Sequence, residues 1–365
     1  MGKFTTMRSF SRTRAVLTTA AVALAALVAA CSSPPPPPPP PVVQAPPPPP
    51  PITLSASLVE RASAFRGYMA RASQVSAAFQ NGEQIQASLK VGAAYEPKSF
   101  MNGAVAYAAV LALQDPTFVA SVREVAANPT QRQEMINNIF SNPSYAAVFK
   151  GADSAAGLII DQIGGDGLKV YMAGKAVKQA AYDVQKASWS KSTVVDRDGR
   201  LASAKTLSAT PALAESADVA VLQQASTGAQ SLGLTPRAAT APYQPVVIRG
   251  LAVAALAALG AAGDDNLASI DALSIDPATG SCLNMAKLNL YQCLAVSKPH
   301  YEDIFCLGQH ILMDTGACMV KAAGASLPPE PPPPPRVLPV KESIAVKGAG
   351  ANSRKAKAAA AKKKG

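Results

Sequence analysis

Cysteines are the residues in this sequence with the clearest capacity for chemistry, and they fall into two groups. The 365-residue chain has five of them. Cys31 stands alone near the N-terminus, whereas Cys282, Cys293, Cys306 and Cys318 lie close together near the C-terminus. A cysteine can carry a covalent modification, form a disulfide or ligate a metal. The surroundings of each group therefore decide which chemistry the sequence indicates.

The residues before Cys31 have the pattern of an export signal. The first fourteen positions hold four basic residues and no acidic one, and residues 15–30 are uncharged and mostly apolar. A basic start, a short apolar segment and small residues at the cleavage point are typical of a secretory signal peptide. The apolar run is shorter than the roughly 20 residues of a membrane-spanning helix. We expect residues 1–30 to be a signal peptide.

Leu27-Val28-Ala29-Ala30-Cys31 resembles the lipobox of bacterial lipoproteins. The resemblance implies that Cys31 is the lipid attachment site, palmitate included, and the first residue of the mature protein. Because each buried CH₂ contributes about 0.8 kcal/mol, such an anchor would be stable. Ser32 stands where these lipoproteins often carry an inner-membrane retention aspartate, so the resemblance implies the periplasmic face of the outer membrane. An ordinary signal peptide that leaves a free thiol is the alternative.

The other four cysteines lie on two segments with helical periodicity. Apolar residues recur at helical spacing through 283–297 and again through 301–323. Lys298-Pro299-His300 lies between these segments and indicates a corner, because proline interrupts a helix. The pattern predicts an antiparallel helical hairpin.

The hairpin geometry favours one pairing of the cysteines. Cys282 and Cys318 are equally far from Pro299-His300 to within one residue, and so are Cys293 and Cys306. Cys282 and Cys293, on one helix, would be roughly 16 Å apart at the α-helical rise, which is too far for a disulfide. We therefore predict nested bridges, Cys282–Cys318 and Cys293–Cys306. An even cysteine count in an exported protein agrees with disulfides.

Two helices with two cysteines each resemble the twin-cysteine helical hairpins of the CHCH type, over about forty residues of this chain. That resemblance also implies nested bridges. Cys306 and Cys318 are twelve residues apart, which is about 120° out of phase on an ideal α-helix. We expect Gly316 to loosen the turn before Cys318.

A metal site is the competing interpretation of the same hairpin. Cys306 and His310 are four residues apart, so one helix face could present both as ligands. His310 also precedes Asp314 by four residues and could pair with it. We expect His300 to be a loop residue, and we predict disulfides rather than a bound metal.

The search for a catalytic site finds only short matches. Ser188-Trp189-Ser190-Lys191 matches the S-x-x-K that supplies a serine nucleophile in penicillin-recognising enzymes, but the companion K-T-G is absent. The sequence has no G-x-S-x-G, and 164–167 lacks the Lys-Ser/Thr of a phosphate loop. We expect no catalytic site and no cofactor. A periplasmic hydrolase of wall or lipid that uses Ser188 or a histidine remains the alternative.

One stretch has a β-like pattern. Val194-Val195 and Asp198-Gly199 predict a hairpin over 193–206. Asp196-x-Asp198-Gly199 also matches part of a calcium loop, but the third acid and the closing glutamate are missing. We interpret it as a turn.

The charge of +11 is not distributed over the whole chain. Residues 52–335 hold 21 basic and 22 acidic residues, a net charge of −1, whereas nine basic residues and one acid follow from Arg336 onward. This distribution argues against a nucleic-acid-binding body and confines the basic surface to the tail.

The elements that would position these residues are helices, because alanine is abundant and alternating β-branched residues are scarce. We predict an all-α, Ala-rich helical bundle with a disulfide-linked hairpin, flanked by disordered segments. Asp115-Pro116, Asn128-Pro129 and Asn142-Pro143 each predict a helix start, with the Asx residue as N-cap and proline in the first turn. The expected helices cover 55–80, 83–92, 99–113, three further segments of about three turns, 151–187 with a break at 164–167, 213–229, and a core helix at 250–263.

The flanking segments are rich in proline or lysine. Fourteen prolines occur within 34–51 and predict a semi-rigid polyproline spacer. A docking site for a proline-binding module is the alternative. We divide the chain into a signal peptide (1–30), lipidated cysteine and tether (31–51), helical body (52–270), disulfide-stapled hairpin (271–326), and Pro-rich spacer with basic tail (327–365).

These parts together predict a non-enzymatic cell-envelope lipoprotein that acts as a tethered scaffold or interaction module between membrane and cell wall. The lipid would hold the membrane. The basic tail would contact an anionic polymer such as lipopolysaccharide or cell wall, at about 1 kcal/mol per basic residue near a charged surface. We also expect a protein partner in the envelope and no nucleic acid.

Overall fold

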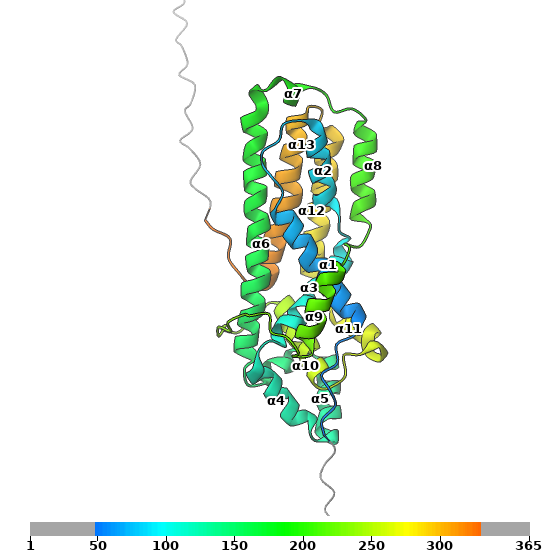
Figure 1. The fold of residues 1–365 in the computed structure, drawn as a ribbon, viewed down its shortest axis with the longest axis vertical. Coiled ribbons are helices and arrows are strands. Elements are labelled where there is room, and N and C mark those ends of the chain that lie inside the picture. Colours follow the sequence, from blue (N-terminus) through cyan, green and yellow to red (C-terminus); the bar gives the residue numbers. More distant parts are fainter. Residues whose placement is uncertain (1–47, 330–365) are drawn as a thin grey trace, which may run out of the picture. The chain divides into compact units, whose positions relative to one another are not determined.

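The computed structural model describes residues 48–329, and this part of the chain is all-α (Figure 1). It contains fourteen α-helices and no strand longer than an isolated bridge. The predicted helical bundle is confirmed. The predicted signal peptide, Cys31, most of the tether and the basic tail lie outside the described residues.

Most of the helices follow one another with short connections, and the long one lies between α9 and α10. The α-helices are α1 (Ala56–Ser73), α2 (Gly82–Ala93), α3 (Pro97–Ala112), α4 (Pro116–Ala126), α5 (Pro129–Ser141), α6 (Ala152–Asp183), α7 (Ser188–Lys191), α8 (Arg197–Ser208), α9 (Ser216–Ser226), α10 (Pro245–Ala258), α11 (Leu267–Leu273), α12 (Pro277–Val296), α13 (His300–Cys306) and α14 (Asp314–Ala323). A π-helical segment, Leu307–Met313, joins α13 to α14.

The three predicted Asx-Pro starts are all present. The carboxylate of Asp115 accepts a hydrogen bond from the Phe118 amide at the start of α4, and Asn128 caps α5 in the same way. Asn142 caps a six-residue 3₁₀ segment, Pro143–Val148, instead of the three-turn helix that we predicted. The cap fixes where a helix begins, whereas its length depends on the packing that follows.

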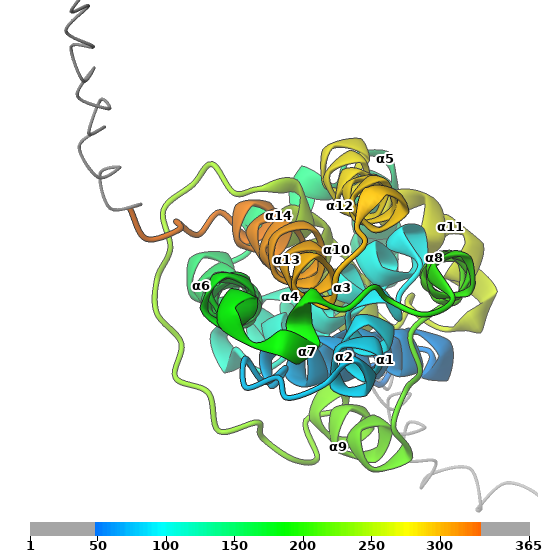
Figure 2. The same cartoon turned by 90° about the horizontal axis from the view of Figure 1, so that it is seen from above.

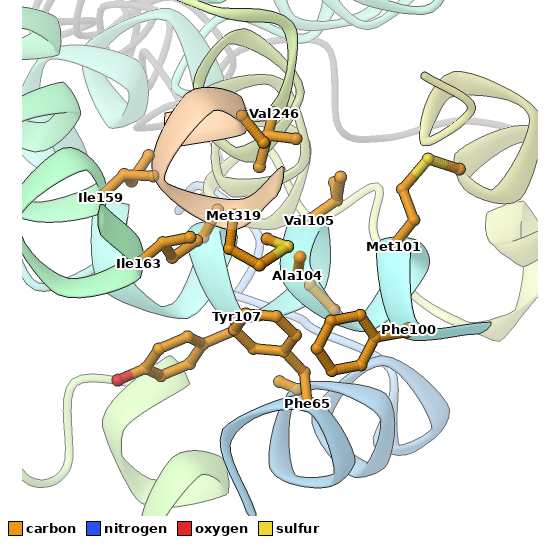
Figure 3. Packing of buried hydrophobic residues seen from close by; sticks show 14 of the residues in the cluster. Phe65, Phe100, Met101, Ala104, Val105, Tyr107, Ile159, Ile163, Val246 and Met319 are labelled. Carbon is orange, nitrogen blue, oxygen red and sulfur yellow. The ribbon is translucent and has the colours of Figure 1, made fainter. Parts of the chain in front are cut away.

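The core is built around α3 and α10. Thirteen of the sixteen residues of α3 are buried, and eleven of the fourteen in α10. The predicted core helix at 250–263 is therefore present, but it runs from Pro245 to Ala258. Gly250 brings the two helices together, because a Cβ there would lie 2.4 Å from the Ala108 Cβ. Figure 3 shows side chains of α1, α6, α10 and α14 gathering around α3, among them Phe65, Ile163 and Met319.

Helix α6 is unbroken where the sequence predicts an interruption. The glycines within 164–167 continue the helix. Gly164 and Gly167 lie against the end of the hairpin with no room for a side chain, whereas a Cβ on Gly165 would meet nothing within 4 Å. A Cβ on Gly167 would lie 2.9 Å from the Val320 backbone nitrogen of α14. Helix–helix contact thus offsets the cost of about 1 kcal/mol for each mid-helix glycine.

The predicted β-hairpin over 193–206 is wrong. Asp196 adopts a left-handed conformation with φ of 52°, and its carboxylate accepts a hydrogen bond from the Gly199 amide at the start of α8. The Asp-x-Asp-Gly stretch is therefore a helix N-terminus and not a strand turn. Only Thr193 forms a bridge, to Pro299 at the hairpin corner.

The connection from α9 to α10 passes around the outside of α6 (Figure 2). The Arg237 guanidinium pairs with Asp161 at 2.6 Å, and the Ala239 amide donates to the Asp153 carbonyl. Gly157 permits this crossing, since a Cβ there would lie 1.6 Å from the Arg237 carbonyl oxygen. The loop is thus fastened to α6 along about two turns.

The end of the predicted tether lies against the body. Arg123 of α4 donates a hydrogen bond to the Pro50 carbonyl at 2.9 Å, and the Thr53 amide donates to the Ala257 carbonyl at 3.0 Å. Residues 48–53 are therefore held at the end of the bundle where α4 and α10 meet (Figure 1).

No single helix among residues 48–329 has the length and apolar character of a membrane span. Helices α3 and α4 pass that test only as a pair and meet at an angle of 90°.

Candidate functional site: the disulfide hairpin and the groove at its tip

The four C-terminal cysteines join two antiparallel helical arms. Cys282 of α12 bonds to Cys318 of α14, with 5.8 Å between the Cα atoms, and Cys293 bonds to Cys306 of α13, with 5.6 Å. This is the nested pairing that the sequence predicts. The corner between the arms lies at Ser297–Pro299, one residue before the predicted Lys298-Pro299-His300. His300 is the first residue of α13 and not the loop residue that we expected.

A π-helical segment sets the phase of the second arm. An ideal α-helix would leave Cys306 and Cys318 about 120° out of phase. In a π-turn the hydrogen bonds close one residue later than in an α-helix, so the extra residue absorbs about 100° of rotation. The irregularity is at Leu307–Met313 and not at Gly316, where we expected it. Gly316 instead serves the contact with α6.

Two glycine pairs bring the second arm against α6. A Cβ on Gly316 would lie 2.6 Å from the Gly167 carbonyl oxygen, and a Cβ on Gly308 would lie 2.8 Å from the Gly174 carbonyl oxygen. The two backbones are therefore in direct contact. This packing fixes the hairpin on the body along a large part of α6.

Two arginines of α8 cap the end of α12. Arg197 donates to the carbonyls of Ser297 and Ala295, at 2.8 and 2.9 Å. Arg200 donates to the Leu294 carbonyl. The last carbonyls of a helix have no intrahelical partner and carry the negative end of its dipole. The guanidinium groups satisfy them, and α8 thereby holds the hairpin corner.

Arg200 also pairs with a fully buried carboxylate, Asp303 of α13. Asp303 accepts further hydrogen bonds from the Ser297 hydroxyl at 2.8 Å and the Gln86 amide at 3.2 Å. The pair therefore connects α2, α8 and both arms of the hairpin. A buried ion pair needs such additional hydrogen bonds to offset its desolvation.

Lys287 is a buried cation on the inner face of α12. Its Nζ donates to the Ala93 carbonyl at 3.0 Å and lies 3.2 Å from the centre of the Tyr95 ring. Burial lowers the pKa of Lys287 well below its ordinary value, and the Glu96 carboxylate opposes this shift. The contact with the ring face supplies part of the stabilisation that water would otherwise give.

Two buried tyrosines complete this polar cluster. The Tyr95 hydroxyl hydrogen bonds to the Thr315 hydroxyl at 2.8 Å, and the Tyr68 hydroxyl donates to the Gly92 carbonyl at 2.9 Å. Burial raises the pKa of both phenols far above the ordinary value. Both phenols therefore stay protonated. The Tyr95 hydroxyl joins the α2–α3 connection to α14 of the hairpin, and the Tyr68 hydroxyl joins α1 to α2.

A groove lies at the tip of the hairpin, between it and the C-terminal end of α6. It consists of two adjoining hollows of about 430 and 350 Å³, which share Gln185 and Tyr301. Tyr182 and Phe305 line the first hollow, and their rings pack edge-on with centres 6.2 Å apart. Lys191 lines the second. We call this the tip groove.

Cys306 and His310, the residues of the alternative metal site, make other contacts in the structure. The Cys306 sulfur is bonded to Cys293 and is therefore unavailable as a ligand. His310 Nδ1 lies 3.5 Å from an Asp314 carboxylate oxygen, the contact that the sequence predicts, although the geometry is not that of a hydrogen bond. Among residues 48–329 no three His, Cys, Asp or Glu side chains gather as a metal site would require.

The S-x-x-K stretch forms the single turn α7. The Ser190 hydroxyl donates to the carbonyls of Val184 and Ala187, so it serves the local fold. Ser188 is exposed. His300 starts α13, and its ring lies against Gly82, where a Cβ would be 2.3 Å from the ring. No described hydrogen bond joins either histidine to a serine hydroxyl.

Neither the family models nor the curated proteins nor the solved structures include one that matches this chain.

Sequence reasoning missed the buried charges and the tip groove. Lys287 interrupts the apolar stripe of Leu283, Leu290 and Leu294, and that position is a visible signal of a buried lysine. Arg200 and Asp303 have no comparable signal, because they come together only through the docking of α8 on the hairpin.

Proposed function

We propose that this protein is a non-enzymatic lipoprotein of the cell envelope that displays a rigid helical module on a proline-rich tether. The observation that carries the proposal is the nested pair of disulfides in a body bounded by proline-rich segments on both sides. Disulfides persist in oxidising compartments such as the bacterial periplasm. The lipobox-like stretch at Cys31 is the second support.

The packing of the hairpin supports a display role. Disulfides, glycine contacts and the two arginines of α8 all hold the hairpin in one position on the body. A rigid surface loses little conformational entropy when it binds a partner. The outer face of α12 carries Met285, Leu288 and Val296, all exposed, and its one charged residue, Lys287, points inward. An uncharged exposed face of this kind is suited to contact with a protein in the envelope.

The localisation is tested by membrane fractionation of the full-length protein and of Cys31→Ser. We expect the parent chain to incorporate labelled palmitate and to fractionate with the outer membrane, and the variant to do neither. Thiol titration of the denatured, unreduced protein should find no free cysteine in the parent chain. Retention of the label in Cys31→Ser would refute lipidation at this residue.

The role of the basic tail is tested separately. We propose that it binds an anionic envelope polymer, lipopolysaccharide or cell wall, so moderate salt should release the Cys31→Ser protein from isolated envelopes. Replacing the lysines of 355–364 with glutamine should have the same effect without salt. Salt-independent binding would exclude this role.

The hydrolase alternative is tested by substitution. Ser188→Ala, His300→Ala and His310→Ala should be compared one at a time with deletion of the whole protein. If the protein is a scaffold, all three variants keep the phenotype of the parent chain. A single variant that reproduces the deletion would favour the enzyme.

A further inference from the structure

The chemistry of the tip groove is that of a site for a proline-rich segment. Three aromatic rings, Tyr182, Tyr301 and Phe305, line it together with the Gln185 amide. Polyproline segments dock in aromatic-lined grooves, because their extended backbone is preformed and loses little entropy on binding. Tyr182 is half exposed, so its ring is available to a ligand.

A second proline run follows α14, whose end lies beside Gly164 of α6. After α14 the backbone crosses α6 at Gly164, where the Ala325 Cβ would lie 2.7 Å from an added Cβ. Pro328, Pro329 and 331–335 follow at once. The N-terminal run, by contrast, ends at Pro51 and is held by Arg123 at the opposite end of the bundle (Figure 1).

The lengths agree. From Gly164 to Tyr182 along α6 is about 27 Å at the α-helical rise. From Ala325 to Pro335 is about 31 Å at the polyproline rise. An extended run of this length would therefore span the distance to the groove.

The charges at the two ends of the segment are opposite to those that they would face along α6 and the groove. Glu330 precedes the five prolines and Arg336 follows them. Along α6 the segment would first pass Lys178, whose Nζ lies 5.8 Å from the centre of the Phe305 ring, and then reach Glu302 nearer the corner. Each end of the segment would thus meet an opposite charge. Lys191 lies beyond, in the second hollow.

We propose that the tip groove binds the protein's own C-terminal proline segment, residues 330–336, within the same molecule. The segment then directs the basic tail along the hairpin. Release of the segment frees the aromatic groove. A partner's proline-rich segment would compete for the same groove.

The proposal is tested by photo-crosslinking in the full-length protein. The photoreactive residue p-benzoylphenylalanine replaces Tyr182 in the groove or, as a matched control, Tyr145, a similarly exposed tyrosine on the 3₁₀ segment after α5. We expect position 182, and not position 145, to crosslink to residues 330–338 of the same chain. Replacing prolines 331–335 with glycine and serine should reduce the crosslink from position 182 to the level of the control.

Mixing chains with two isotopic labels separates binding within one molecule from binding between molecules. A crosslink from position 182 between differently labelled chains, or one that reaches only the folded body, overturns the proposal. Trp189, the one tryptophan of the chain, stands in the sequence between the groove residues Gln185 and Lys191 and gives a second readout. Its emission should shift when the prolines are replaced, and an unchanged spectrum together with an unchanged crosslink also overturns the proposal.

Discussion

The buried pair of Arg200 and Asp303 should be the most sensitive polar contact in the body. Arg200→Met keeps most of the side-chain volume and removes the charge. Asp303 then stays fully buried with only the Ser297 hydroxyl and the Gln86 amide as partners. The Leu294 carbonyl at the end of α12 also loses its guanidinium donor.

The expected loss in the free energy of unfolding comes from the Asp303 carboxylate, which stays buried without its cationic partner. Removing one partner of a buried ion pair costs about 3–5 kcal/mol, because the other charge is left uncompensated. The two hydrogen bonds that Asp303 retains place Arg200→Met toward the lower part of this range. Replacing both residues, as in Arg200→Met with Asp303→Leu, leaves no buried charge and should recover most of the loss.

The assay is urea unfolding of the oxidised protein followed by circular dichroism, with all variants compared at one pH and salt concentration. Arg66→Met is the matched control, because Arg66 pairs with Asp218 at 2.6 Å but is exposed for more than a third of its side chain. An exposed pair of this kind contributes about 0–1 kcal/mol. If Arg200→Met cost no more than Arg66→Met, or if the double variant were as unstable as the single one, the reasoning would be refuted.

Three further predictions concern the hairpin and its packing. Lys287→Met should stabilise the protein at pH 7. Burial lowers the pKa of Lys287 in the folded state, so the parent chain loses stability as the pH falls from the unfolded pKa of about 10.4 toward the folded pKa. The stability gained by Lys287→Met should therefore shrink as the pH rises from about 7 to about 9.5. Urea unfolding of both proteins at each pH measures this difference. Gly174→Ala should destabilise α6, since its Cβ would lie 2.6 Å from the Met313 nitrogen, whereas Gly165→Ala should stabilise it by about 1 kcal/mol because nothing lies within 4 Å. Removing the outer bridge, Cys282–Cys318, should lower the free energy of unfolding by about 4 kcal/mol, and removing the inner bridge should lower it by about 3 kcal/mol. The outer bridge contributes more because it closes the longer loop. Thermal unfolding of the paired alanine variants measures both losses.

Each of these predictions has an outcome that contradicts it. A constant difference between Lys287→Met and the parent chain across this pH range would mean that Lys287 has the same pKa in the folded and unfolded states. The buried tyrosines cancel in the comparison, because both proteins contain them. Equal effects at the two α6 glycines would mean that the backbone contact with the hairpin is not tight. A larger loss from the inner bridge would show that loop length does not dominate.

Helix starts and the disulfide pairing could be predicted because both depend on local chemistry and spacing. Asp115 and Asn128 cap their helices with their own side chains, whatever surrounds them. The distances of the cysteines from Pro299 fix which of them can meet once an antiparallel hairpin forms. Neither inference needs knowledge of the rest of the fold.

The errors have a common cause in contacts between distant segments. The glycines within 164–167 predict a break, yet the helix continues and the backbone of α14 makes glycine the residue that fits at position 167. The stretch beginning Val194-Val195 has strand propensity, but docking of Arg200 on the hairpin makes the following residues the helix α8. Propensity is a weak prior that tertiary packing overrides.

The sequence by itself determined the helical class of the described residues, the corner at Pro299 and which cysteines pair, because periodicity, capping and spacing are properties of a single segment. Only the tertiary structure decided that a π-turn brings Cys318 into phase, that Lys287 and Asp303 are buried charges, and that aromatic residues from α6 and α13 line one groove. These features exist because α6, α8 and the hairpin pack closely, and close packing between segments far apart in the chain has no signature in any one of them.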